Sequence, residues 1–258
     1  MNRDIHINTL NHFFNKIYVL TIPRAVERHK QLQLDLSGLN FEFFYGADKQ
    51  SLTKENLIEN NIYNEEQAIK NSRYNKPMKM GEIACSLGHK LIYEDILKNN
   101  YSKVLILEDD VFFNEEGLTN LASIIEQLQG AKWDLVYFDY NKNDTKKWFH
   151  NLKKLIYHLQ NKLGLLKWNH KMIDNLFAKP YSLNLKIAGY HDYTSAYAIN
   201  YFAAKKLHNI HSPISFPADH ALAFTITNEI IKAYITVPKL FLQKSQDSNT
   251  AFVSYVED

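Results

Sequence analysis

Three consecutive carboxylates, Glu108, Asp109 and Asp110, follow an apolar run and are the side chains of this sequence best suited to chemistry. In open α/β sheets ligands bind beyond the carboxyl ends of strands, where these acids are expected. Adjacent negative charges repel, and a hard divalent cation would compensate them and bridge a diphosphate. In extended chain, Glu108 and Asp110 point to one side and Asp109 to the other. Solvated loop acids, or an N-cap for the helix after Gly117, are the alternative.

A threonine and two arginines at the end of an earlier apolar strand are further candidates. Thr21 offers its hydroxyl or its backbone to a nucleobase, and Arg24 and Arg28 follow it within seven residues. Guanidinium groups near a strand end can bind a phosphate or a base carbonyl. A solvated helix face explains both arginines equally well.

Two expected helix starts carry polar side chains. Gly81 and Glu82 open one helix, whose free N–H groups suit an anion or a sugar hydroxyl. Glu82 can accept a hydrogen bond from a sugar, although an N-terminal glutamate is also ordinary helix chemistry. Asp219 and His220 follow Pro217 at the other start, where Asp219 can equally be a cap.

These candidates require a sheet that brings their strand ends together. Strands are expected at residues 16–22, 41–48, 103–113 and 133–140, at the start of 194–210, and within 231–243. Helices are expected at residues 25–36, 51–75, 81–99 and 117–129, in the rest of 194–210, and at 217–230. This alternation predicts an α/β fold with a mainly parallel sheet flanked by helices. We expect one domain over residues 1–258, with a basic helical insertion at about 142–186.

The insertion carries an amphipathic pattern in residues 146–168. Its apolar residues recur every three or four positions and fill one arc of a helix: Trp148, Leu152, Leu155, Ile156, Leu159, Leu163 and Leu166. The lysines outside that arc are Lys146, Lys147, Lys153, Lys154 and Lys162. The pattern is typical of a helix lying on an anionic membrane surface. A core-facing helix with solvated lysines is the near-equal alternative.

Charge and composition limit the classes of function. Residues 141–190 carry ten lysines, no arginine and two acids, a formal charge of +8, while the rest of the chain carries −6. This local basic segment does not indicate nucleic-acid binding, which favours a basic face with arginine across the domain. The single cysteine, Cys85, rules out an internal disulfide and a cysteine-based zinc site. Without a recognisable signal peptide or long apolar run, we expect a cytoplasmic protein peripheral to the inner face of the membrane.

Ordered sequence blocks provide a resemblance. GEIACSLGHKLIYEDIL at 81–97, followed by KVLILEDDVFF at 103–113, resembles glycosyltransferase family 25. That family includes bacterial galactosyl- and glucosyltransferases of surface lipooligosaccharides and the galactosyltransferases that modify collagen. Further blocks at 17–32, 195–207 and 212–224 fit in the same order. Outside the lysine-rich segment, the resemblance runs from about Lys16 to Leu242.

The resemblance implies a GT-A-type, Rossmann-like fold, a UDP-sugar donor, usually UDP-galactose, and inversion at the anomeric carbon. It implies a divalent metal at Glu108 and Asp110, commonly Mn²⁺ with Mg²⁺ as the other candidate. Asp109 is assigned to substrate binding. Asp219 matches the family's late aspartate and is our candidate general base, with Asp139 as its competitor. His220 is a further candidate metal ligand.

Other positions are carried over in the same way. His89 is expected to contact donor or acceptor, whereas a lone helix histidine is otherwise structural. Gln243 matches a loosely defined C-terminal segment, with Asp247 and Ser248, that would cover the donor. The chain departs from the family where Ala84 precedes Cys85, in place of glycine, and where Gly88 precedes His89, in place of serine. These departures leave the selectivity for donor and acceptor open.

The sequence therefore predicts a metal-dependent, inverting hexosyltransferase acting on a lipooligosaccharide, a related glycolipid or an oligosaccharide. A non-catalytic glycan- or nucleotide-binding module derived from such an enzyme is the alternative. A metal-dependent nucleotidyltransferase or phosphohydrolase is a third reading, disfavoured because the sequence contains no G-x-x-x-x-G-K-[ST] motif.

Overall fold

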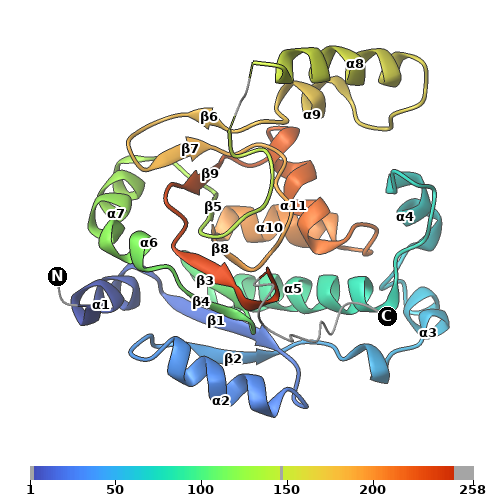
Figure 1. Cartoon of the computed structure of the whole chain (residues 1–258). Helices are drawn as coiled ribbons and strands as arrows, with labels where there is room; N and C mark the ends of the chain where they lie inside the picture. The colour runs from blue at the N-terminus through green and yellow to red at the C-terminus, as the bar shows by residue number, and fades with distance from the viewer. Residues whose placement is uncertain (1–2, 146–147, 247–258) are drawn as a thin grey trace.

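Short β-branched and leucine-rich runs form the central strands of the protein. The computed structural model describes residues 3–145 and 148–246 (Figure 1). The strands are β1 (Lys16–Thr21), β2 (Glu42–Tyr45), β3 (Lys103–Glu108), β4 (Val111–Phe113), β5 (Leu135–Tyr137), β6 (Lys179–Pro180), β7 (Leu185–Ile187), β8 (Ala196–Asn200), β9 (Ala233–Thr236) and β10 (Phe241–Gln243).

Helices follow most of these strands along the chain. The larger ones are α1 (Arg3–Phe13), α2 (Val26–Asp35), α5 (Met80–Asn99), α7 (Leu121–Gly130), α8 (His150–Lys162), α10 (Tyr201–Ile210) and α11 (Ala218–Thr227). The shorter ones are α3 (Lys54–Glu59), α4 (Glu65–Asn71), α6 (Glu115–Thr119) and α9 (His170–Asp174), with 3₁₀ turns η1 (Lys49–Ser51) and η2 (Lys244–Gln246). No helix in the described ranges is long and apolar enough to cross a bilayer.

The central sheet has the strand order β2-β1-β3-β8-β5-β9-β7-β6. β1 pairs in parallel with β2 and β3, and β5 with β9, whereas β8 lies antiparallel between β3 and β5. β7 and β6 extend the far edge with antiparallel pairing. The predicted α/β class, a Rossmann-like sheet flanked by helices, is confirmed, but the sheet is mixed. The sequence pattern could not show this, because a strand buried on both faces has the same apolar pattern whether it runs parallel or antiparallel to its neighbours.

Both faces of the sheet are buried, as β3 illustrates. Leu105 and Leu107 join the core beneath α1, α2 and α7, while Val104 and Ile106 join the core beneath α5, α10 and α11. Alternate residues of a strand point to opposite faces, so an apolar side chain at each of these positions is required. The strand therefore stays apolar until Glu108, where it reaches the edge of the core.

A second, two-stranded sheet continues from the acidic turn. β4 pairs antiparallel with β10, which places Gln243 opposite Val111, immediately after the acids. Helix α6 lies against the segment leading into β10, and it can approach because residue 117 is glycine. A Cβ on Gly117 would lie 2.2 Å from the carbonyl oxygen of Lys239 and 2.6 Å from the Cα of Leu240. This contact fixes the position of β10 beside the carboxylates.

We expect Gly117→Ala to lower the free energy of unfolding by about 1–3 kcal/mol, because backbone atoms must move to admit the methyl group. Urea denaturation followed by circular dichroism measures this change. Gly130→Ala is the matched control, since a Cβ there has no atom within 4 Å. Equal stability of the Gly117 variant and the wild type would refute the close packing of α6 on β10.

The lysine-rich insertion is only partly helical. Within the predicted 142–186 range, α8 and α9 form a separate layer at the top of Figure 1, whereas β6 and part of β7 belong to the central sheet. The helical part of the predicted insertion is thus α8 and α9, and the end of the range belongs to the sheet. The chain between Asn143 and Ala178 is here called the excursion. It begins and ends at one place, because the backbone N–H of Ala178 donates to the carbonyl of Asn143 at 2.9 Å.

Candidate functional site

A cavity of about 190 Å³ lies at the carboxyl ends of β1 and β3. It brings together residues from five separate parts of the chain: Leu20, Thr21, Ile22, Arg24, Arg28, Gly46, Ala47, Asp48, Lys49, Gly81, Ala84, Cys85, Gly88, Glu108, Asp109, Asp110, Gln243 and Ser245. Pockets for small molecules commonly enclose about 300–1,000 Å³, so this one would enclose only part of a nucleotide-sugar.

The carboxylates of Glu108 and Asp110 both contact one side chain, the amide of Gln243. The Gln243 side-chain amide donates to Glu108 Oε2 at 3.3 Å and to Asp110 Oδ1 at 3.4 Å. The hydroxyl of Thr194 donates to Glu108 Oε1 at 2.5 Å. The i, i+2 relation across the end of β3 thus places two acidic side chains around one point, as expected for that spacing.

Asp110 carries an uncompensated negative charge in a buried position. Burial, with the neighbouring Glu108 carboxylate, raises the pKa of Asp110 to about 6, against hydrogen bonds from Ser245 and Gln243 that act to lower it. Among the ion pairs of residues 3–145 and 148–246, neither Glu108 nor Asp110 has a lysine or arginine partner. Two carboxylates that need positive charge suit a hard divalent cation, which completes its coordination with water and substrate phosphate.

Asp109 points elsewhere and has its own partners. Its Oδ1 accepts from Arg28 at 2.6 Å, and its Oδ2 accepts from the Thr21 hydroxyl at 2.6 Å. Thr21 is also 3.0 Å from the ring nitrogen Nε2 of His29. These contacts join the ends of β1 and β3 to α2. Arg28 therefore compensates one of the three acids, and Thr21 and Arg28 line the cavity as residues held in place by Asp109.

Arg24 is fixed by an aspartate that sequence reasoning did not single out. Its Nε donates to Asp48 Oδ2 at 2.6 Å, and this bond is the main cause of the lowered pKa of Asp48.

The loop after β2 packs closely against α5 at the wall of the cavity. A Cβ on Gly46 would lie 2.8 Å from Leu20 Cδ1 and 3.3 Å from the Cα of Gly88. Gly88, where the family often has serine, is thus part of a tightly packed cavity wall.

His89 and Cys85 belong to α5, and both lie close to Glu108 at the end of β3. His89 is fully buried, with Nδ1 2.8 Å from the Tyr197 hydroxyl and Nε2 3.8 Å from Glu108 Oε1. That Nε2 atom has no hydrogen-bond partner among the described residues. Burial, with the nearby Glu108 and Asp219 carboxylates, raises the pKa of the Cys85 thiol well above its usual value. Its sulfur, a His89 ring nitrogen and a Glu108 carboxylate oxygen all lie within 4.8 Å of one another, so these three residues form a first group of candidate metal ligands.

The two residues at the start of α5 have different surroundings. Gly81 lines the cavity. The carboxylate of Glu82 turns back and accepts from the backbone N–H of Lys79 at 2.8 Å. This bond satisfies a free donor at the helix start, so the ordinary helix chemistry considered for Glu82 is present.

Residues 192–195 link the acids at β3 to the start of α11. Thr194 binds Glu108, while the backbone N–H of the preceding Tyr193 lies 3.5 Å from Asp219 Oδ2. Tyr193 has a φ of 79°, a left-handed conformation that is costly for a residue with a side chain. The strained turn thus contacts both acids through adjacent residues, Asp219 through Tyr193 and Glu108 through Thr194.

Asp219 belongs to a second group of candidate ligands. Side-chain atoms of Asp192, Asp219 and His220 all lie within 4.8 Å of one another, and Asp192 also pairs with Lys142. His220 is therefore grouped with these acids and is absent from the lining of the cavity that holds Glu108 and Asp110. Asp219 is not the N-cap of α11, since that position is Pro217, and its Oδ1 accepts from the N–H of His220 at 2.8 Å.

Asp139, the alternative candidate for the general base, is buried in the interior of the protein and held by several partners. It is fully buried and accepts from the Ser195 hydroxyl at 2.7 Å and from the backbone N–H of Tyr140 at 2.9 Å. Its Oδ1 also pairs with Lys239 Nζ at 2.9 Å. A carboxylate with this many partners and no exposed surface is suited to holding β5 and β8 together.

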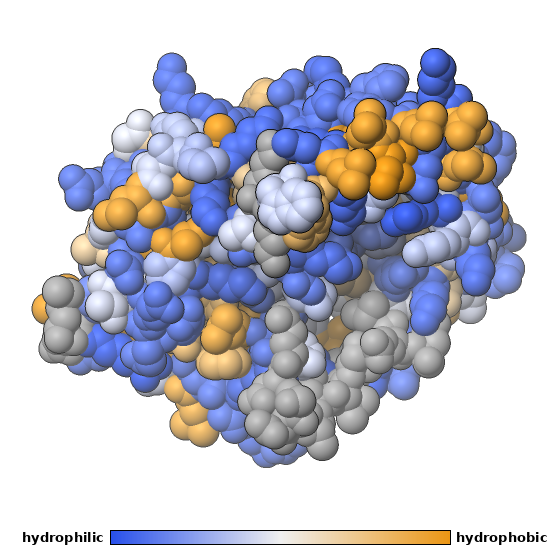
Figure 2. All heavy atoms as spheres, turned by 45° about the horizontal axis from the view of Figure 1, so that its top comes forward, coloured by the Kyte–Doolittle hydropathy of each residue, from blue (hydrophilic) through white to orange (hydrophobic). Residues whose placement is uncertain are grey.

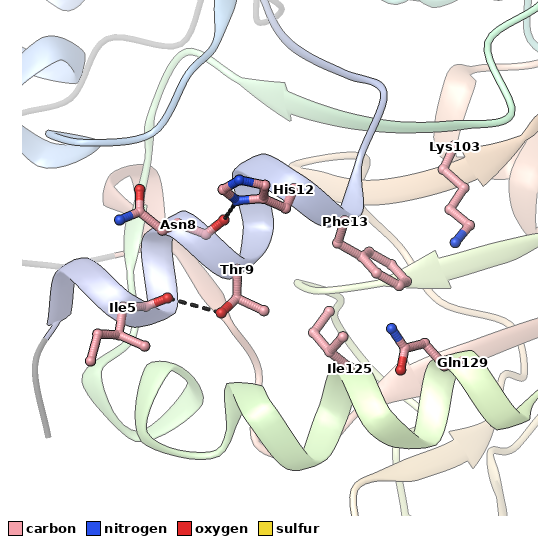
Figure 3. A pocket seen from close by; sticks show the side chains of 8 residues that line it. All are labelled: Ile5, Asn8, Thr9, His12, Phe13, Lys103, Ile125 and Gln129. Atoms are coloured by element: carbon pink, nitrogen blue, oxygen red, sulfur yellow. Dashed lines mark hydrogen bonds between the residues drawn. The ribbon is translucent and has the colours of Figure 1, made fainter.

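A larger open hollow of about 540 Å³ lies between α1 and α7 (Figure 3). Its polar side chains are used locally: the Thr9 hydroxyl donates to the carbonyl of Ile5, and a His12 ring nitrogen lies 2.6 Å from that of Asn8. Its lining contains no carboxylate. It therefore lacks the convergent polar groups of the cavity at β3.

Comparison with known proteins agrees with this geometry. The family model "Glycosyltransferase family 25 (LPS biosynthesis protein)" matches residues 14–222, which include the acids, the turn at 192–195 and Asp219. The chain belongs to glycosyltransferase family 25. The resemblance seen in the ordered sequence blocks is confirmed.

Curated relatives of this family 25 chain include proteins of several animals. A glycosyltransferase 25 family member of Aedes aegypti is 31% identical over 137 residues, which is 51% of this chain and 22% of that protein. Procollagen galactosyltransferase 2 of Mus musculus is 23% identical over 52% of this chain and 22% of its own length. The human protein named inactive glycosyltransferase 25 family member 3 is 23% identical over 75% of this chain and 28% of its own length. The chain thus spans about a quarter of these relatives.

Several residues of the candidate site were not predicted. Asp48, Asp192 and Thr194 are single polar residues in loops, and each acquires its role from a partner far away in the sequence. Thr194 immediately precedes one of the matching blocks, which was the one available signal. The predicted residues Asp247 and Ser248 lie outside the described residues.

Proposed function

We propose that this chain transfers a hexose, galactose from UDP-galactose, to a glycan acceptor of the lipooligosaccharide type, with inversion at the anomeric carbon. The observation that supports this most is the convergence of Glu108 and Asp110 on one point at the end of β3, beside Arg28 and Arg24. Family membership supports a sugar donor and a glycan acceptor in general.

A divalent cation, Mn²⁺ or Mg²⁺, fits the donor set, and Glu108 and Asp110 would hold it. When bound, it would neutralise the charge that develops on the departing diphosphate. The protein's own residues would bind and position the rest of the donor. Gly81 and the arginines line the part of the cavity where the donor would lie, and Asp109 keeps Arg28 and Thr21 in place.

Asp219 is the proposed general base. As the acceptor oxygen forms its bond to the anomeric carbon, the bond to the diphosphate oxygen breaks and its electron pair leaves with UDP. The proton of the acceptor hydroxyl passes to a carboxylate oxygen of Asp219. Glu108 and Asp110 are poorly suited to this role, because a carboxylate bound to a metal is a weak base.

A thermal-shift screen of nucleotide-sugars, with and without Mn²⁺, tests this function. A ligand that binds only the folded state raises the melting temperature by mass action. We expect UDP-galactose with Mn²⁺ to raise it by several degrees, and each component alone to raise it less. If no nucleotide-sugar shifts the melting temperature in either condition, the proposed donor site is wrong.

A non-catalytic binding module is the second candidate, favoured by one observation. Among the relatives described above, the human protein is aligned over the largest share of this chain, 75%. It is named inactive glycosyltransferase 25 family member 3. The two candidates differ in one readout, since a transferase slowly hydrolyses its UDP-sugar when acceptor is absent. Donor binding without measurable release of UDP, even with a panel of glycan acceptors, would favour the binding module.

A further inference from the structure

Helix α8 carries its apolar side chains on the outside of the protein. None of the residues of α8 is buried. The side chains that form this outward surface, here called the α8 ridge, are Leu152, Leu155, Ile156, Leu159 and Leu163, which are 58%, 66%, 45%, 57% and 63% exposed. Orange patches in Figure 2 lie on the face that contains α8 in Figure 1. The alternative of a core-facing helix is therefore wrong.

The polar side of α8 holds the helix on the body. The ring of His150 stacks on Phe177 at 3.9 Å, and the amines of Lys153 and Lys154 lie over the same ring at 5.7 and 5.8 Å. His158 Nε2 is 2.9 Å from a carboxylate oxygen of Asp174 in α9. The orientation is thus fixed by several contacts, and it is opposite to that of an ordinary surface helix.

An exposed ridge of this kind marks a surface that something covers. Single exposed leucines are normal, but five on successive turns form a continuous apolar strip. Trp148, 89% exposed, precedes the helix, and Leu165, 74% exposed, follows it. Tryptophan is enriched where an apolar phase meets water, because its ring is apolar and its N–H is polar.

The charge around the ridge selects the occupant. Residues 141–190 carry a formal charge of +8 and no arginine, while the remainder carries −6. Protein interfaces favour arginine and disfavour lysine at their centres. Leucine and tryptophan on one side, with lysine on the other, match a helix at a lipid surface. We propose that the α8 ridge inserts into the interface of an anionic membrane, with the exposed lysines of this segment, such as Lys162, attracting the lipid headgroups.

The position of the ridge gives this binding a use. Tyr157 of α8 contacts Trp168, Trp168 stacks on Tyr190, and the Tyr190 ring lies 6.2 Å from the ring of His220, which follows Asp219. The membrane surface would therefore lie on the part of the molecule that holds the proposed base, where a membrane glycolipid acceptor must arrive. This consequence rests on the proposed transferase function, whereas membrane binding itself does not.

Vesicle flotation of the full chain without nucleotide-sugar tests the proposal. We expect binding to phosphatidylcholine vesicles that contain phosphatidylglycerol, little binding to phosphatidylcholine alone, and weaker binding at high salt. The double variant Leu155→Ser/Leu159→Ser removes two ridge side chains from exposed positions, so folding should be unaffected. It should lower the vesicle partition coefficient at least about tenfold, because inserted apolar area drives part of the binding.

The matched control is Ile5→Ser/Leu34→Ser, at helix positions 61% and 70% exposed on α1 and α2, on the other side of the molecule in Figure 1. It should bind vesicles like the wild type. Unchanged binding by the ridge variant, or no wild-type binding, would overturn the proposal. A wild-type dimer in light scattering that the ridge variant converts to monomer would show that a second copy covers the ridge, which also overturns it. A thermal shift with UDP-galactose is scored separately, so failure of one proposal is distinguishable from failure of the other.

Discussion

Asp110→Asn is expected to reduce galactosyl transfer by about a thousandfold and to remove the Mn²⁺ dependence of UDP binding. The substitution keeps the shape of the side chain and removes its charge, which is what a cation between Asp110 and Glu108 requires. Asp110→Ala should be slightly more harmful. Transfer assays and calorimetric titration of UDP, each with and without Mn²⁺, measure both effects.

Folding does not confound this test. The pKa of Asp110 is raised to about 6, above the value of about 4 of an unfolded aspartate. Stability therefore falls as pH rises through this window, and at neutral pH the buried charge opposes folding. Asp110→Asn should melt no lower than wild type when metal is absent. Asp48→Asn is the control carboxylate of the same cavity, and it should keep the Mn²⁺ dependence. Full wild-type transfer in excess chelator would exclude the metal.

Asp219→Asn is expected to lower turnover by about 10²–10⁴-fold while donor affinity stays normal. The amide retains the hydrogen-bonding oxygen for the N–H of His220 but cannot take the acceptor proton. Turnover with an acceptor glycan used by the wild type, and calorimetric affinity for UDP-galactose, separate catalysis from binding. Equal losses in both would indicate a structural role for Asp219.

Two neighbouring aspartates serve as controls for the Asp219 variant. Asp139→Asn should lower the melting temperature, because Lys239 loses the buried negative charge with which it pairs, and any loss of turnover should follow that loss of folded protein. Asp192→Asn tests the second acid beside Asp219, whose partner is Lys142. A selective loss of turnover in either control, with Asp219→Asn active, would transfer the role of base to that residue.

The order and kind of most elements could be predicted from the sequence. The buried strand β1 and the long helix α5 begin and end within about two residues of the predicted ranges, because each has strong periodicity or clear turn residues at its ends. The strand predicted at 103–113 begins as expected, but a turn at Asp109 and Asp110 divides it into β3 and β4. Helix α1 was not predicted, since its apolar residues are few among polar ones. β6 and β7, of two and three residues, are too short to show a pattern of alternation.

The site was harder to predict because its contacts join distant residues. The sequence pattern indicated that Glu108 and Asp110 share a side, but it could not show that Arg28, 81 residues away, takes Asp109. Nor could it orient α8, because periodicity defines an apolar arc without saying which side faces the body. Both answers depend on tertiary packing, which a single sequence records only indirectly.

The hydrogen bond between Asn143 and Ala178 has a consequence for the evolution of such chains. Because the excursion leaves and returns at one point, the chain between these ends can change in length at a small cost in closure entropy. The strands on either side would keep their register. We therefore expect the excursion to behave as an exchangeable module, through which one catalytic body is redirected to acceptors in different physical settings while its donor chemistry is unaltered.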